Sequence, residues 1–259
     1  MDLAWIMTIF AIGFLGSFIS GMVGIGGSII NYPMLLFIPP ALGFAAFTAQ
    51  EVSAISAVQV FFASFMGMLV FRRGGHVNKT LVLYMGVSII TGSFLGSFVS
   101  NTLPSSVINI VYAILALIAA GMMFLPKKGN DSQNLSKVTF NKRLAITLAF
   151  MIGTVSGIVG AAGAFITVPV MLVVLKIPTR VAIASSLAIT FISSIGSTTG
   201  KLMGGHMLLI PSIVLVIAST IASPIGAKLS KNINTKMLQW ILAGLISATV
   251  LKIWISILF

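Results

Sequence analysis

Ten apolar runs of helical length constrain the fold of this chain more than any other feature of its sequence. They cover about residues 3–22, 27–38, 48–71, 80–100, 105–125, 144–160, 163–176, 181–200, 207–227 and 237–257. A helix needs about 20 apolar residues to cross a bilayer. Most runs approach that length, whereas the second and seventh reach only about 12–14 residues. We therefore expect an all-α polytopic membrane protein in which two segments are too short to cross at full thickness.

The charge content of the chain excludes a soluble globular domain. Only 7% of the 259 residues are charged, whereas a soluble domain carries about 25%. The net charge of +12 would suggest a nucleic-acid partner in a soluble protein, but here it follows from the positive-inside bias with very few acids. We expect the lipid bilayer as a partner and no nucleic acid. The absence of cysteine excludes disulfides, iron–sulfur clusters and thiol catalysis.

The two halves of the chain repeat each other. Residues 20–36 (SGMVGIGGSIINYPMLL) align with 156–172 (SGIVGAAGAFITVPVML) at an offset of 136 residues, and later matches keep an offset of 130. Two separated blocks of matches indicate an internal duplication. We expect a first membrane repeat over 1–125, a linker over 126–143 and a second membrane repeat over 144–259.

Each repeat contains five apolar segments, an odd number, so we expect two inverted repeats that face opposite ways in the membrane. With the N-terminus outside, thirteen of the fifteen Lys and Arg residues fall in inward loops, and only Lys201 and Lys252 face outward. The positive-inside rule then places both termini outside and the 126–143 loop in the cytoplasm. Charge counting does not separate two short spans from a re-entrant hairpin, and both arrangements stay open.

A glycine-rich motif interrupts the helices early in each repeat: GMVGIGG at 21–27 and GIVGAAG at 157–163. Irregular backbone within a membrane is tolerated only where it is buried in protein or lines a cavity. The short helix after each break begins with free amides that suit an anion, and inverted-repeat transporters bind substrate between broken helices. We expect substrate binding by the following residues: Gly24, Gly26, Gly27, Ser28, Asn31, Ser56, Gly160, Ala162, Gly163, Ala164, Thr167 and Ser186.

Close packing of helices through small residues is the alternative explanation for the glycine-rich motifs. Their duplication, each time before an unusually short segment, favours a binding site. For Ser53, Ser56, Ser185 and Ser186, substrate binding and interhelical packing are equally good interpretations. No basic residue falls in the middle of any of the apolar runs, so we expect amides and hydroxyls to recognise the anion.

Two charged residues are candidates for coupling and steering. Glu51 lies near the outer start of the third segment and is a candidate to carry a coupled proton; the alternative is a side chain that only reaches interfacial water. Lys201 is placed to draw anions to the outer mouth, although a lysine that snorkels to the interface is the commoner arrangement. The turn residues His76 and His206 are expected to build turns and not to relay protons.

These motifs resemble the sulfite exporter TauE/SafE family of membrane permeases. Each half carries the SG-x-x-G-x-x-G…P pattern, and the GGH turns at 74–76 and 204–206 and the small-residue helix at 180–194 are similar too. The second motif departs from the pattern at Ala161 and Ala162, where it has fewer glycines. The resemblance covers nearly the whole chain. It implies a bacterial inner-membrane transporter for small anions, often sulfite, sulfonates or other organosulfur compounds.

We therefore expect a secondary transporter that moves a small anion across the cytoplasmic membrane by alternating access. A transporter of another anion, such as a carboxylate, and a non-transporting membrane assembly subunit are the alternatives, and a homodimer is left open. An enzyme is not expected, because the sequence has no HExxH or GxSG motif and too few acids and histidines for a metal site. No cofactor is expected.

Overall fold

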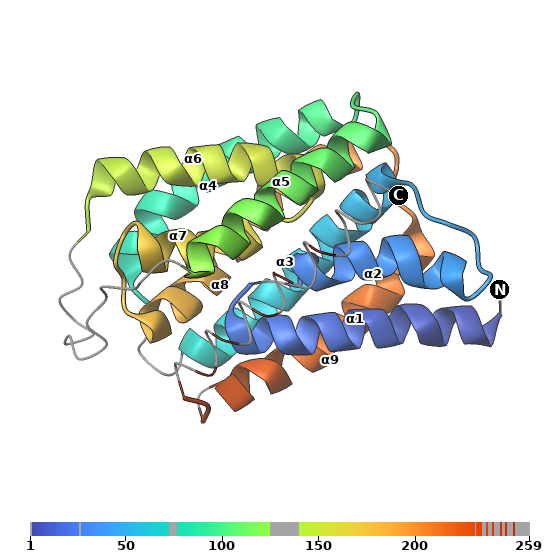
Figure 1. The fold of residues 1–259 in the computed structure, drawn as a ribbon, viewed down its shortest axis with the longest axis horizontal. Coiled ribbons are helices and arrows are strands. Elements are labelled where there is room, and N and C mark those ends of the chain that lie inside the picture. Colours follow the sequence, from blue (N-terminus) through green and yellow to red (C-terminus); the bar gives the residue numbers. More distant parts are fainter. Residues whose placement is uncertain are drawn as a thin grey trace.

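The chain folds into a bundle of α-helices, without strands in the part of the chain that the structure describes (Figure 1). The computed structural model describes residues 2–25, 27–72, 77–124 and 140–230, with isolated positions from 232 onward. The helices within these ranges are α1 (Leu3–Val23), α2 (Ser28–Ala41), α3 (Ala49–Arg72), α4 (Lys79–Ser100), α5 (Ser105–Phe124), α6 (Lys142–Val159), α7 (Ala164–Val173), α8 (Thr179–Leu202) and α9 (Leu209–Ser230).

These bounds confirm the first nine apolar runs as helices to within a few residues at each end. Seven of the described helices are long and apolar enough to cross a membrane. The other two, α2 with 14 residues and α7 with 10, are the predicted short segments. The predicted run at 237–257, the first GGH turn and most of the 126–143 linker lie outside the described residues.

Each glycine-rich motif turns the chain back on itself. Gly24 ends α1 with φ 83° and Gly27 precedes α2 with φ 96°, while Gly160 and Gly163 take φ 74° and 72° around the second break. Positive φ values are easy for glycine and strained for other residues. Since α2 then runs back along α1 (Figure 1), a Cβ on Gly16 would overlap the side chain of Asn31. We call α1 with α2 the first hairpin and α6 with α7 the second hairpin.

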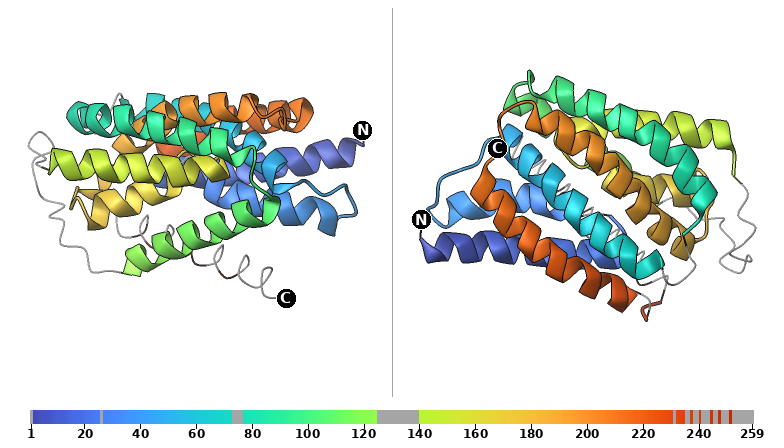
Figure 2. Two further views of the ribbon diagram at one scale, coloured as in Figure 1. Left: turned by 90° about the horizontal axis from the view of Figure 1, so that it is seen from above. Right: turned by 180° about the vertical axis from the view of Figure 1, so that it is seen from behind.

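Four long helices form one layer of the bundle. Seen from behind, α4, α8, α3 and α9 lie side by side in that order (Figure 2), and neighbours in this series are in contact. The hairpins pack on this layer in a crossed manner, because α1 of the first half lies on α9 of the second half and α6 of the second half lies on α4 of the first. Gly21 approaches the backbone of α9 as Gly157 approaches that of α4, which allows both contacts to be close.

Hydrogen bonds between the halves are reciprocal as well. The hydroxyl of Ser93 donates to the carbonyl of Ser193 at 2.7 Å, and that of Ser223 donates to the carbonyl of Ala63 at 2.6 Å. Both donors and both acceptors are related by the offset of 130 residues. Exchanged contacts of this kind are what two units related by a two-fold axis make. The orientation of each repeat in the membrane stays a prediction.

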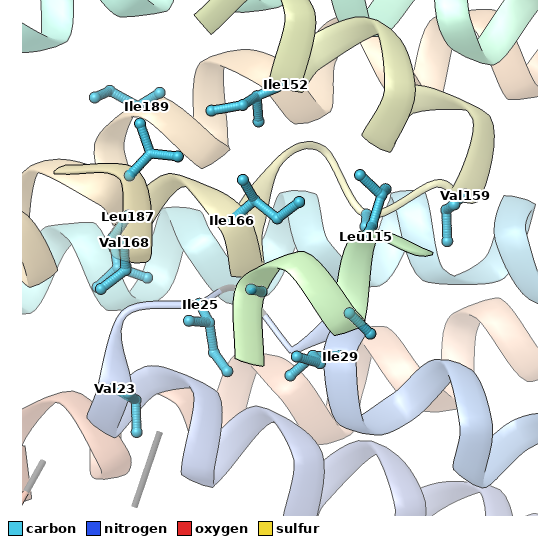
Figure 3. Packing of buried hydrophobic residues seen from close by; sticks show 14 of the residues in the cluster. Val23, Ile25, Ile29, Leu115, Ile152, Val159, Ile166, Val168, Leu187 and Ile189 are labelled. Carbon is cyan, nitrogen blue, oxygen red and sulfur yellow. The ribbon is translucent and has the colours of Figure 1, made fainter. Parts of the chain in front are cut away.

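The core lies where the hairpins meet the central helices. Figure 3 shows buried hydrophobic residues of this region, with Ile25 and Ile29 from the first hairpin and Ile152 and Ile166 from the second. Leu115 of α5 belongs to the same cluster. Apolar packing therefore surrounds both breaks, and any polar group in this region must find its partner locally.

Candidate functional site

The tip of each hairpin rests on a central helix of the opposite half. A Cβ on Gly24 would lie 2.8 Å from the carbonyl oxygen of Ile183 in α8, and one on Gly160 would overlap the carbonyl of Ser53 in α3. The Ser186 hydroxyl also donates to the Gly24 carbonyl at 2.7 Å. The predicted residues of the two motifs are thus brought together with α3 and α8, and not left in separate parts of the fold.

Buried polar atoms without a partner gather at the first hairpin. The hydroxyls of Ser20 and Ser28, both polar side-chain atoms of Asn31 and the Oε1 atom of Gln59 make no hydrogen bond to a described residue. All four side chains are fully buried. We call Ser20, Ser28, Asn31 and Gln59 the first-hairpin cage.

Gln59 and Asn31 contact α1 of the first hairpin, and Ser20 and Ser28 share the helix faces of that hairpin. Gln59 of α3 donates from Nε2 to the Ser17 hydroxyl of α1 at 2.8 Å, and the same nitrogen lies 2.6 Å from where a Cβ on Gly27 would be. Asn31 lies against Gly16, the neighbour of Ser17. Ser20 and Ser28 are one helical turn from Ser17 and Asn31 respectively, and so share their helix faces.

Such a concentration of unsatisfied groups is unusual. Roughly 90% or more of buried polar groups in native proteins have a partner, and each one left without a partner costs about 1–3 kcal/mol. No charged side chain belongs to the cage, so the groups that it offers a ligand are neutral amides and hydroxyls beside a helix start; substrate binding by Ser28 and Asn31 stays a prediction. The arrangement suits a ligand that supplies the missing hydrogen bonds.

The equivalent positions of the second hairpin are satisfied or apolar. The Ser156 hydroxyl donates to the carbonyl of Ile152 within α6, and the Thr167 hydroxyl donates to the carbonyl of Gly163 at 2.6 Å. The counterpart of Gln59 is Ile189, which is fully buried. A Cβ on Gly163 would lie 2.9 Å from Ile152 and from Ile89. Figure 3 shows Ile152 and Ile189 in the same buried cluster as Ile166 of α7.

Other predicted site residues take varied places. The Ser56 hydroxyl, one turn before Gln59, makes no hydrogen bond to a described residue. Ala162 adopts φ 50°, so the second tip keeps a left-handed bend without glycine at that position. Gly26 and the side chain of Ala164 lie outside the described residues.

The sequence analysis did not single out Gln59. A signal for it exists, because Gln59 is a lone amide in the middle of the apolar run at 48–71, away from the polar residues at the start of that run. Polar residues inside membrane helices usually face the interior of the bundle and are functional. An amide in the middle of a membrane span obeys the same rule as an intramembrane acid, so the sequence alone identifies Gln59 as a candidate.

Glu51 takes part in a capping box at the start of α3. Its carboxylate accepts from the Thr48 amide at 2.8 Å and from the Thr48 hydroxyl at 3.0 Å, while its own amide donates to the Thr48 hydroxyl at 3.2 Å. This reciprocal arrangement satisfies free amides at a helix start. The proposed coupling role of Glu51 stays a prediction, and the capping box gives the residue a structural role that needs no proton transfer.

Lys201 does not snorkel to the interface, which corrects the expectation from its place near a helix end. Its side chain is 3% exposed. Its ammonium donates to the Ser100 hydroxyl at 2.6 Å and to the Ile158 carbonyl at 2.9 Å. The same carbonyl accepts a hydrogen bond from Ser53 at 3.3 Å. The cation therefore caps the negative end of α6, just before the second break.

No group of three or more His, Asp or Glu side chains that could hold a metal ion occurs among the described residues.

Comparison with known proteins gives one consistent result. Residues 9–253 match the protein family described as sulfite exporter TauE/SafE. The chain is 22% identical to the probable membrane transporter protein YunE of Bacillus subtilis, over 89% of this chain and 90% of the relative. It is 24% identical to a probable membrane transporter protein of Methanocaldococcus jannaschii, over 91% and 90% of the two chains.

A third relative, a probable membrane transporter protein of Haemophilus influenzae, is 27% identical over 85% of this chain and 83% of its own. No solved structure matches the chain significantly. The family match spans both hairpins and the two central helices, so it covers the whole of the site described above.

Proposed function

Because the chain belongs to the sulfite exporter TauE/SafE family of membrane transporters, we propose that it is a secondary transporter that moves a small anion across the cytoplasmic membrane by alternating access. Sulfite, a sulfonate or another organosulfur anion is the proposed substrate. The chain is not proposed to be an enzyme.

The observation that carries this proposal is the set of buried, unpaired polar groups beside the helix start at Gly27. The first amides of α2 lack partners within the helix, and the positive end of its dipole lies there. Amides and hydroxyls that converge beside a helix start are a common way to bind an anion without a buried cation. A charge-assisted hydrogen bond contributes about 1.5–3 kcal/mol, so several offset part of the dehydration of the anion.

Alternating access requires that the buried site open to one side at a time. The first hairpin tip rests on α8 and the second on α3. The described side-chain hydrogen bonds that join the hairpins to these two helices include Ser186 to Gly24, Ser53 to Ile158, Gln59 to Ser17 and Lys201 to Ile158. Inverted-repeat transporters move one bundle against the other around a fixed site. We propose that the hairpins move against α3 and α8 in this way.

Transport by purified protein in lipid vesicles tests the proposal. Vesicles with the protein should take up labelled sulfite or a short sulfonate in a saturable manner, and uptake with and without a proton gradient shows whether protons are coupled. Gly27→Leu should reduce uptake to that of empty vesicles, because a side chain there meets Gln59 and φ 96° disfavours it.

Gly121→Leu is the matched control, since a Cβ at Gly121 would have nothing within 4 Å, and its uptake should be unchanged. Uptake of carboxylates in place of sulfur anions would support the transport function and show that the proposed substrate is wrong. Folded protein that moves no anion tested would contradict the proposal and favour an assembly subunit.

A further inference from the structure

The proposed transport function does not specify which hairpin binds the substrate or which hydrogen-bonding groups the substrate carries. We propose that the first hairpin alone recognises the anion, and that the first-hairpin cage selects a monoanion that also carries a hydrogen-bond donor. This inference rests on the proposed function and adds the location of the site and the chemical class of its ligand.

The location follows from comparing equivalent positions of the two halves. Asn31 and Gln59 have unpaired atoms, whereas their counterparts Thr167 and Ile189 have none: the Thr167 hydroxyl is bonded to Gly163, and Ile189 is apolar. Duplication gave both halves the same backbone bend, with glycines at positive φ. The bend is therefore not what distinguishes a binding hairpin. What distinguishes it is the unmet hydrogen-bonding groups at these equivalent positions, which occur at Asn31 of the first hairpin and at Gln59 of α3 beside it. The unpaired hydroxyls of Ser56, Thr190 and Ser193 lie on α3 and α8, outside the two hairpins.

The class of ligand follows from the kinds of atoms left unpaired. A carboxamide presents one acceptor oxygen and an NH2 group whichever way it is turned. Asn31 has both unpaired, and Gln59 has an unpaired oxygen while its nitrogen serves Ser17. The cage thus offers acceptors as well as donors. An anion that only accepts hydrogen bonds would leave the Asn31 oxygen, and the Gln59 oxygen as its amide is oriented in this structure, without partners and facing negative charge.

The charge of the ligand is limited for a second reason. The cage contains no cation, and the one lysine found buried among the described helices, Lys201, is bonded to Ser100 and Ile158 near the second hairpin. Dipoles alone must then replace the hydration of the anion. The hydration of an ion grows with the square of its charge, so a dianion is disfavoured more than a monoanion.

Two sources can supply the donor: the acidic proton of a partly protonated oxyanion, or a hydroxyl or ammonium group on an organic anion. Both have the chemistry that the cage requires, one negative charge and one donor. Because all four cage side chains are fully buried, either ligand would enter while the hairpin is displaced and be enclosed afterwards.

Binding to the purified full-length protein, measured by calorimetry without any gradient, tests the inference. The probes are matched pairs: ethanesulfonate with 2-hydroxyethanesulfonate, and propionate with 3-hydroxypropionate. Sulfite is measured at a pH where hydrogen sulfite predominates and at one where the dianion predominates. The donor-bearing member of at least one pair should bind tenfold tighter or more. The organic pairs and the sulfite pair together tell the two sources of the donor apart. Equal affinity within all pairs would overturn the selection.

Variants test the location. Asn31→Leu and Gln59→Leu should each weaken binding at least tenfold, and Gln59→Leu should also remove the preference for the donor-bearing ligand. The matched controls are Thr167→Val and Ile189→Leu at the equivalent positions, which should bind as the parent does. If the second-hairpin variants lose as much affinity as the first-hairpin variants, recognition by the first hairpin alone is wrong.

Thermal unfolding shows whether a variant that binds poorly has lost the binding site or has lost its fold. Asn31→Leu removes polar atoms that have no partner among the described residues, so the melting temperature without ligand should stay the same or rise. Loss of binding with retained stability supports the cage. If instead Asn31→Leu binds normally and unfolds at a lower temperature, the cage holds only structural water, and the inference fails while transport can still be observed. Absence of binding and transport for every anion would instead remove the proposed function.

Discussion

At the scale of single residues, Lys201 is the least expected feature. A lone buried ammonium in a membrane helix is expensive, and such residues usually mark functional sites. Both of its acceptors have a second hydrogen bond: the Ile158 carbonyl accepts from Ser53, and the Ser100 hydroxyl donates to Ser97 at 2.6 Å. Neither would be left alone if the ammonium were removed. We therefore expect the fold to tolerate the loss of this charge, and we propose that the charge acts on the transported anion.

We expect Lys201→Met to keep or raise the melting temperature and to lower anion transport about fivefold to thirtyfold, which corresponds to roughly 1–2 kcal/mol of interaction between a buried unit charge and a nearby anion. Because the ammonium is buried, the loss should be the same at low and high salt. Vesicle uptake at two ionic strengths measures this, with the exposed Lys79→Met as control. A loss that disappears at high salt would mean that Lys201 acts from water.

At the scale of elements, α2 depends on a side chain from another helix. Pro33 lies inside α2 and has no amide proton, so the carbonyl of Ile29, four residues earlier, lacks its helical donor. The hydroxyl of Tyr112 from α5 donates to that carbonyl at 2.7 Å. The rings of Tyr112 and Tyr32 are also stacked, with centroids 4.4 Å apart. The two contacts fix α2, and with it Ser28 and Asn31, against α5.

Tyr112→Phe should destabilise the protein by about 1–3 kcal/mol, because it leaves the Ile29 carbonyl buried without a donor. In a Pro33→Ala background the restored amide can bond to Ile29, so the same change should cost clearly less. A double-mutant cycle of thermal or chemical unfolding in detergent measures the difference. Equal costs in both backgrounds would show that the hydroxyl does not replace the missing amide.

At the scale of the whole molecule, the contacts of one half are repeated by the other with the partners exchanged. The hydroxyl of Ser93 donates to α8 and that of Ser223 donates to α3. In the same way, α1 packs on α9 of the second half, and α6 packs on α4 of the first half. Exchange of partners is compatible with inverted repeats. The distribution of Lys and Arg supports the same arrangement from sequence.

Cysteine labelling can test the inverted arrangement directly, since the chain contains no cysteine. Thr102 and Asn232 are equivalent at the offset of 130, and both are exposed. In intact cells, Thr102→Cys should react with an impermeant reagent and Asn232→Cys should react only after permeabilisation. Labelling at Asn134→Cys should also require permeabilisation. Reaction of both equivalent positions from the same side would rule out inversion.

The sequence by itself determined the class of fold and most helix bounds, because membrane helices are defined by local hydrophobicity and length. It also determined the positions of both breaks, since the positive φ values at Gly24, Gly27, Gly160 and Gly163 depend on glycine locally. The prediction of Ser28 and Asn31 as site residues follows from the same local argument. Their buried side-chain atoms make no hydrogen bond to a described residue, and substrate binding by them stays a prediction.

Only the tertiary structure decided what faces each break. Gln59 follows Gly27 by 32 positions in the sequence, and Ser186 follows Gly24 by 162, yet both lie against the first hairpin. Thr167 is satisfied locally, because its hydroxyl reaches the Gly163 carbonyl four residues earlier. Whether a distant helix supplies a partner for the amide of Asn31 is decided by the tertiary structure alone, and among the described residues none does. For the same reason, the burial of Lys201 between α4 and α6 follows from helix packing, and its place near a helix end suggested the opposite.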